Sequence, residues 1–179
     1  MLWTILIVAG VAVAVLVAFI ASRPSDFTIT RTGTMSAPPA TVFAQVNDFH
    51  KWTAWSPWES IDPQLKREYS GPNAGIGAHY HWVGNREVGE GQMTITESRP
   101  GERILIKLEF LKPFKATNDT IFSFAPQGNG TLVTWTMKGR NSFMMKAMGL
   151  MMNMDKYLGG QFEQGLAKMK TVSESAVKT

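Results

Sequence analysis

The first pattern in the chain is an unbroken apolar run at its N-terminal end. From residue 2 to residue 21 every side chain except that of Thr4 is apolar or is glycine, and none is charged. An α-helix needs about 20 such residues to cross the hydrocarbon core of a bilayer, and Trp3 suits an interfacial anchor. We therefore predict a membrane-spanning helix over residues 2–21.

Two alternatives to a membrane-spanning helix have to be weighed. A cleaved signal peptide is disfavoured because no basic residue precedes the run and because the run is longer than a usual signal-peptide core. A buried core helix would need protein on all sides, which a terminal segment of a small domain rarely has. We therefore prefer the membrane-spanning helix to both alternatives.

After a short polar linker, residues 22–26, the pattern changes to alternation. Residues 27–31 alternate apolar and polar side chains, which predicts a strand. Ser36 followed by two prolines predicts the start of a helix with Ser36 as its N-cap, ending near Phe49. Residues 52–63 combine three Trp with two Pro and indicate a short helix and turns rather than a strand.

The rest of the chain predicts strands followed by one helix. The expected strands, separated by short Gly-, Asn- and Pro-containing turns, are residues 66–70, 78–83, 91–98, 103–111, 116–124 and 131–138. Such short connections predict an antiparallel meander, because parallel strands need long crossovers. Residues 143–173 lack Pro and are rich in Met, Leu, Lys and Glu, which predicts one long helix with a kink or close-packing point at Gly159 and Gly160.

These elements define the fold class and the domain boundaries. The sheet must cover its apolar face, and the last helix is the only large element available for this. We therefore predict an α+β domain over residues 27–173, in which a curved antiparallel sheet of about seven strands surrounds the long C-terminal helix. Residues 174–179 would form a tail.

Composition and charge exclude several classes of function. All 18 Lys and Arg and all 14 Asp and Glu lie outside the apolar run, and the net charge is +4. The basic residues are scattered along the sequence. A nucleic-acid-binding protein usually concentrates its basic residues on one face or helix, so we expect no nucleic-acid partner. The chain has no Cys, which excludes disulfides, thiol catalysis and Cys-ligated metals. Arg23 and Arg31 follow the apolar run, which favours a domain on the cytoplasmic side.

The order and spacing of several short motifs are similar to those of a known superfamily. These motifs are residues 37–43, 47–52, 55–59, 69–72, 75–77, 82–85 and 88–91. Together they resemble the START-like superfamily, also called Bet v 1-like or SRPBCC, and within it the polyketide cyclase/dehydrase and lipid transport branch. The resemblance covers about residues 27–172. It implies a helix-grip fold with an internal hydrophobic cavity for lipids, sterols, polyketides or quinone-like molecules. Members bind, carry or, less often, transform such ligands.

Strand alternation and helical spacing select the side chains that would line this interior. The predicted ligand-binding residues are Trp55, Tyr80, Trp82, Ile106, Leu108, Phe110, Phe122, Trp135, Met148, Met152 and Phe162. Plain core packing is the alternative for each of them. The many Met side chains between residues 144 and 154 indicate either an adaptable pocket or an apolar face resting on the bilayer. The Trp-rich segment is either a lid over the cavity mouth or a packed corner.

Few residues are candidates for metal binding or catalysis. His79 and His81 point to the same side of their strand, and such a pair can begin a metal site, with Glu68, Glu90 or His50 as a third ligand. If the intervening Tyr80 faces inward, however, both histidines face water, so we predict no metal.

His50 beside Asp48 could form an oriented base, but no further residues assemble a catalytic set. We predict no cofactor and no catalytic residue. The leading hypothesis is a membrane-anchored START-like protein that binds an apolar ligand, such as a lipid, an isoprenoid or a polyketide-like molecule. One alternative is an enzyme of the cyclase/dehydrase type, in which His50, Tyr80 or a pocket carboxylate assists proton transfer. The other is a non-catalytic interaction module whose own side chains fill the cavity.

Overall fold

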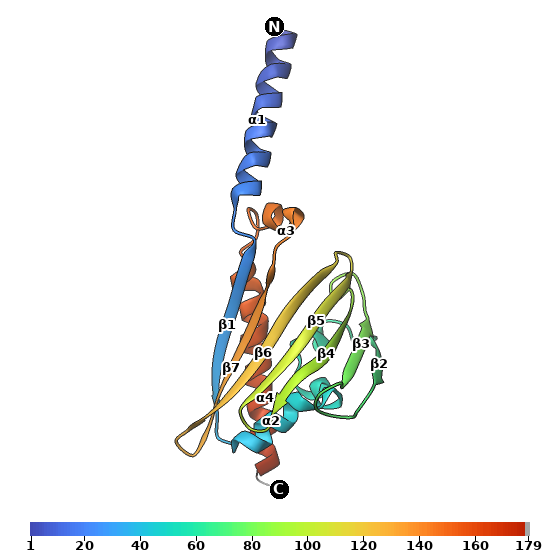
Figure 1. Cartoon of the computed structure of the whole chain (residues 1–179), viewed down its shortest axis with the longest axis vertical. Helices are drawn as coiled ribbons and strands as arrows, with labels where there is room; N and C mark the ends of the chain where they lie inside the picture. The colour runs from blue at the N-terminus through green and yellow to red at the C-terminus, as the bar shows by residue number, and fades with distance from the viewer. Residues whose placement is uncertain (178–179) are drawn as a thin grey trace.

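The computed structural model describes residues 1–177 and consists of one antiparallel sheet, one long helix laid across it, and an N-terminal helix that projects away (Figure 1). The seven strands follow the order β1-β7-β6-β5-β4-β3-β2, so the N-terminal strand closes the meander by pairing with the last strand. The predicted α+β fold with its curved sheet and C-terminal helix is confirmed.

The strands lie close to the positions predicted from alternation. Their bounds are β1 (Asp26–Met35), β2 (Lys66–Ser70), β3 (His79–Val83), β4 (Glu90–Arg99), β5 (Arg103–Lys112), β6 (Ala116–Gln127) and β7 (Gly130–Arg140). Side chains on the concave face alternate with solvent-facing ones, and those of Ile104, Ile106 and Leu108 on β5 are all buried. This alternation is what gives the sheet one apolar face to cover.

Helices cover the concave face and one end of the sheet. They are α2 (Pro39–Asn47), the 3-10 helices η1 (Phe49–Ala54) and η2 (Pro57–Ser60), α3 (Phe143–Met148) and α4 (Met154–Val177). Figure 1 shows α4 running alongside β1 and β7 toward α2, and α4 packs mainly against β1 and α2. The apolar side of α4, with Phe162, Leu166 and Met169, is buried in the core.

The C-terminal region is two helices rather than the single long helix predicted over residues 143–173. The helix α3 ends at Met148, with Gly149 at its C-cap position, and α4 begins only at Met154. Each new start is capped: the Ser142 side chain accepts the N–H of Met145 at 3.3 Å, and the Asn153 side chain accepts the N–H of Lys156 at 3.0 Å. Gly149 at the C-cap of α3 and the Asn153 cap of α4 thus divide a sequence of otherwise good helix formers into two helices.

The predicted cap of the first domain helix is also corrected. Helix α2 begins at Pro39, its N-cap position is Pro38, and no side chain caps it. The backbone N–H of Ser36 instead donates to the Glu174 carboxylate at 2.7 Å, so Ser36 connects the strand end to α4. Because α4 continues through Val177, this contact lies inside the helix and not in a tail.

The helix α1 (Leu2–Ser22) is long and apolar enough to cross a membrane. It points away from the domain (Figure 1), and Ile20 is its only buried residue, so it is not a core helix. The connection to the sheet is short, since β1 begins at Asp26 and the N–H of Asn141 donates to the carbonyl of Ser25 at 2.7 Å. This hydrogen bond extends the β1–β7 pairing to the residue before β1, three residues after the end of α1.

Candidate ligand-binding site

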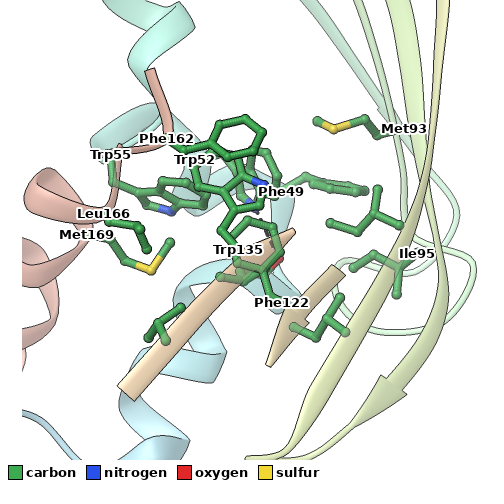
Figure 2. Close-up of a cluster of buried hydrophobic side chains, with 14 of the residues drawn as sticks. Phe49, Trp52, Trp55, Met93, Ile95, Phe122, Trp135, Phe162, Leu166 and Met169 are labelled. Atoms are coloured by element: carbon green, nitrogen blue, oxygen red, sulfur yellow. Dashed lines mark hydrogen bonds between the residues drawn. The ribbon is translucent and has the colours of Figure 1, made fainter. Parts of the chain in front are cut away.

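Aromatic rings fill the space between the concave face and α4. Trp135 on β7 lies at the centre of this cluster (Figure 2) and stacks on Phe162 of α4, with ring centroids 4.2 Å apart. Phe122 on the neighbouring strand is 4.8 Å from Trp135, and Trp55 meets the same ring edge-on at 5.8 Å. Two strands, α4 and the turn after η1 thus contribute rings to one packed unit.

The Trp-rich segment is tied to α2 through indole hydrogen bonds. Nε1 of Trp52 donates to the carbonyl of Val46, and Nε1 of Trp55 donates to the carbonyl of Gln45, each at 3.0 Å. Both indoles are buried and use carbonyls at the end of α2. These two tryptophans therefore form a packed corner. Trp58 is only partly buried and lies edge-on over Trp135 at 5.9 Å.

The predicted ligand-binding residues separate into two groups. Eight belong to the buried core, and these are Trp55, Tyr80, Trp82, Ile106, Leu108, Phe122, Trp135 and Phe162. Phe110 is partly buried and packs against the edge of that core. Met148 lies at the end of α3 and Met152 in the turn that follows, and neither belongs to the core cluster or packs against it. Whether the core members contact a ligand stays a prediction.

Six buried side-chain polar atoms have no hydrogen-bond partner among residues 1–177, including Oγ of Ser173 on α4, and three of the six lie on the concave face of β6 and β7. These three are the side-chain oxygens of Asn118 and Thr120 on β6 and Nε1 of Trp135 on β7. All three side chains are buried and belong to the concave face of adjoining strands. The sequence analysis missed Asn118 and Thr120, although the alternation that placed Phe122 inward places these two residues inward as well.

An ion pair lies behind the aromatic cluster at the β2–β3 edge. Arg67 on β2 donates to the Glu59 carboxylate of η2. Burial raises the pKa of Tyr80 well above its ordinary value, and the negative charge of the nearby Glu59 raises it further. Tyr80 therefore stays a neutral phenol at physiological pH, stacked on Tyr69 at 5.2 Å, and it does not supply a phenolate base.

A small pocket of about 110 Å³ is lined in part by His50 and Tyr69. Nδ1 of His50 lies 2.8 Å from the Asp48 carboxylate, an arrangement that resembles an oriented base, and the imidazole stacks on Tyr69 at 4.2 Å. An imidazole that donates from Nδ1 to a carboxylate has its Nε2 free to accept a hydrogen bond. His50 is 49% exposed, so this pair is at the surface.

The two histidines of β3 both make contacts with polar side chains. Nδ1 of His79 is 3.0 Å from the Thr94 hydroxyl, and the His81 ring lies 3.5 Å from both Glu68 and Glu90. Their outward direction agrees with the burial of Tyr80 between them. Within the part of the chain described, no group of three His, Asp or Glu side chains has a geometry that could hold a metal ion.

A larger pocket than this one lies elsewhere, where α1 meets the domain. It is open, has a volume of about 490 Å³, and is lined by Arg23, Pro24, Asn141, Met145, Lys146, Gly149, Leu150, Met151, Met152, Asn153 and Met154. Met152 is the one predicted ligand-binding residue that this pocket includes. The Met-rich stretch recognised in the sequence therefore lines an opening at the end of the domain from which α1 projects.

A family model for polyketide cyclase / dehydrase and lipid transport proteins matches residues 26–174, which is nearly the whole domain. The chain belongs to this family. The resemblance inferred from the short motifs is thereby confirmed, and the family suggests that the helix-grip domain binds hydrophobic molecules. No curated protein matches the sequence. The helix α1 lies outside the family match.

Solved structures share the fold of this family member at low sequence identity. A protein from Chromobacterium violaceum has a TM-score of 0.61 at 18% identity, over 82% of this chain and 96% of its own. The Aha1 dimer from Colwellia psychrerythraea has a TM-score of 0.59 at 14% identity, over 83% of this chain and 96% of its own. The di-domain ARO/CYC StfQ of the steffimycin biosynthetic pathway has a TM-score of 0.64 at 11% identity, over 87% of this chain and 53% of its own.

Proposed function

We propose that this protein is a membrane-anchored binding protein for an apolar ligand, such as a lipid, an isoprenoid or a polyketide-like molecule, that carries at least one hydrogen-bonding group. The ligand would lie between the concave face and α4, and no covalent chemistry would take place. The observation that carries this proposal is the set of unpartnered polar atoms on Asn118, Thr120 and Trp135 inside an otherwise apolar interior.

Buried polar atoms without a partner have lost the hydrogen bonds that they make to water in the unfolded chain. A buried donor or acceptor without a partner costs about 1–3 kcal/mol, and unpartnered groups of this kind call for a specific explanation. Nε1 of Trp135 can donate to a carbonyl or hydroxyl oxygen, and the Thr120 hydroxyl can donate or accept. The Asn118 side chain offers an amide on the same strand face. An apolar molecule with one polar group would recover this lost free energy.

Entry of the ligand would require rings to move. Trp58 is the partly buried member of the cluster, and it covers both Trp135 at 5.9 Å and Phe162 at 6.4 Å. Unlike Trp52 and Trp55, its indole has no hydrogen bond to α2 among those described. Displacement of Trp58 is therefore the least costly way to expose Trp135, and we assign it the role of a movable cover.

The anchor follows from the length and composition of α1. Its 21 residues correspond to about 31 Å at 1.5 Å per residue, close to the thickness of the hydrocarbon core. The short connection to β1 would keep the domain near its ligand source. Arg23, which follows the helix directly, favours a single-pass orientation with the domain on the cytoplasmic side.

Native mass spectrometry with lipid extraction tests the proposal on full-length protein released gently from its own membrane. We expect one apolar molecule per chain, and we expect Thr120→Val to lower its occupancy. Thr117→Val, on the outer face of the same strand, is the matched control and should leave occupancy unchanged. An empty protein that also takes up no lipid, quinone or fluorescent fatty acid would refute the proposal.

One observation favours a second function, that of an interaction module. The rings of Trp55, Phe122, Trp135 and Phe162 already fill the centre of the interior, as expected if the cavity served only as a core. The empty protein in the experiment above is the outcome that this function predicts. The enzymatic alternative is less favoured, because the 110 Å³ pocket beside His50 is smaller than the roughly 300–1,000 Å³ of a typical site for a drug-sized molecule.

A further inference from the structure

The open pocket at the junction of α1 and the domain is lined by two chemically different kinds of residue. Its polar lining includes the cations Arg23 and Lys146 together with Asn141 and Asn153, and no Asp or Glu is among its lining residues. Its apolar lining consists largely of methionines. A site lined by both cations and methionines is complementary to an anionic amphiphile.

The two cations lie at the end of α1, and neither has an acidic partner among residues 1–177. Nζ of Lys146 donates to the carbonyl of Ala21 at 3.2 Å, which attaches α3 to the last turn of α1. A lysine ammonium has three N–H donors, so two remain for a further acceptor. The Arg23 guanidinium lies over the Phe19 ring, 5.9 Å from its centroid. That contact leaves the N–H groups at the edge of the guanidinium available to an anion.

The apolar side is built from residues that a soluble surface usually avoids. Met151 is 95% exposed, and Leu150 and Met152 in the same turn are also exposed. Phe143 and Met144 on α3 extend this surface toward solvent. Methionine adapts its shape to irregular apolar partners, and a contiguous exposed apolar surface marks an interaction site.

The position of the pocket identifies its occupant. Figure 1 shows α3 beside the domain-proximal end of α1, and the pocket takes residues from both the α1 end and the segment after α3. If α1 spans the bilayer, Arg23 and Lys146 lie where lipid phosphates lie, and the apolar turn lies at the edge of the acyl region. The surface is thus continuous with the surface of α1 that contacts lipid.

We infer that this junction pocket binds one anionic phospholipid of the host bilayer. Its phosphate would lie between Arg23 and Lys146, and the start of an acyl chain would pack against Met145, Leu150 and Met151. This inference rests on the membrane anchoring proposed above. It is separate from the interior site, with which the pocket shares no residue.

Photo-crosslinking tests the inference on full-length protein in phosphatidylglycerol nanodiscs that contain a phosphatidylglycerol probe with a diazirine near its glycerol. We expect adducts on the peptide that spans residues 145–154. The double variant Arg23→Gln and Lys146→Gln should lower their yield by roughly an order of magnitude. Phosphatidylcholine nanodiscs with the matching phosphatidylcholine probe should give a similarly low yield.

The matched control is the double variant Lys51→Gln and Lys170→Gln, which removes two exposed cations on η1 and on the distal half of α4. It should leave the yield unchanged. Adducts confined to residues 2–22 would overturn the pocket while leaving the anchor intact. Equal yields in the two lipids would also overturn it. Release of the protein from native membranes by alkaline carbonate would overturn both the pocket and the anchor.

Discussion

The guanidinium of Arg31 occupies the space that a Cβ atom on Gly159 would need. Arg31 projects from β1 under α4, where it donates to the Asp155 carboxylate at 3.0 Å and to the Glu163 carboxylate at 2.8 Å. One cation therefore links two turns of the helix to the edge of the sheet. The missing side chain at Gly159 allows this approach, which identifies the close-packing point expected from the Gly159–Gly160 pair.

Gly159→Ala and its neighbour Gly160→Ala should change stability in opposite directions. In either position alanine favours the helix over glycine by about 1 kcal/mol. The added methyl group at position 159, however, displaces the guanidinium of Arg31, and overpacking of this kind costs about 1–3 kcal/mol. At Gly160 nothing lies within 4 Å of the added methyl. We expect Gly159→Ala to lower the free energy of unfolding and Gly160→Ala to raise it, measured by urea unfolding of the full chain in mild detergent. Equal gains would contradict the packing role.

The ion pair between Arg31 and Asp155 should make the free energy of unfolding depend on pH in the acid range. The hydrogen bond from Arg31 holds the pKa of Asp155 below its usual value. Because the folded pKa lies below the unfolded one, the stabilisation is present above about pH 4 and is lost as the pH falls through the folded pKa. Asp155→Asn should therefore flatten the acid side of the stability curve. Arg31→Gln should flatten it as well, and adding Asp155→Asn to Arg31→Gln should change it no further. Additive effects would show that the two residues act separately.

Two buried threonines should respond differently to valine. Oγ1 of Thr131 donates to the carbonyl of Ala37 at 2.7 Å, whereas Oγ1 of Thr120 has no partner in the described chain. Thr131→Val should cost about 1–2 kcal/mol because it leaves a buried carbonyl unpaired. Thr120→Val should leave the ligand-free protein equally stable or make it more stable, because an unpaired hydroxyl is replaced by a methyl group. Thermal unfolding of delipidated protein measures both, and equal losses would refute the assignment of Thr120.

The faces of the sheet could be predicted from alternation, but the filling of its interior could not. The period of two placed Tyr80, Trp82 and Trp135 inward, and all three are buried. Whether a concave interior stays open depends on the summed volume of the rings that enter it from η1, η2 and α4, and this is a property of tertiary packing. The contact of Trp135 with Phe162 joins residues from two elements, and no local pattern contains that information.

The Met-rich segment was assigned to a single helix because its residues have high helix propensity. Its position at the junction with α1 follows from the break that the structure places after Met148. Two local signals for that break are visible in the sequence, namely Gly149 and the polar Asn153 followed by Asp155. Summed propensity outweighed these signals in the prediction, although a cap and a C-terminal glycine decide where a helix ends.

Asn153 offers a test in which the sign of the result decides between the two descriptions of this segment. As the cap of α4, its side chain accepts the N–H of Lys156 at 3.0 Å, and Asn153→Ala should lower the free energy of unfolding by about 0.5–2 kcal/mol. Inside one continuous helix the same change would raise stability, because Ala is the better helix former. Ser142→Ala removes the cap of the short helix α3 and is the comparison. Since α3 can open locally, its loss should raise hydrogen exchange over residues 143–148 with little effect on global unfolding, whereas Asn153→Ala should also lower the protection of the first turns of α4.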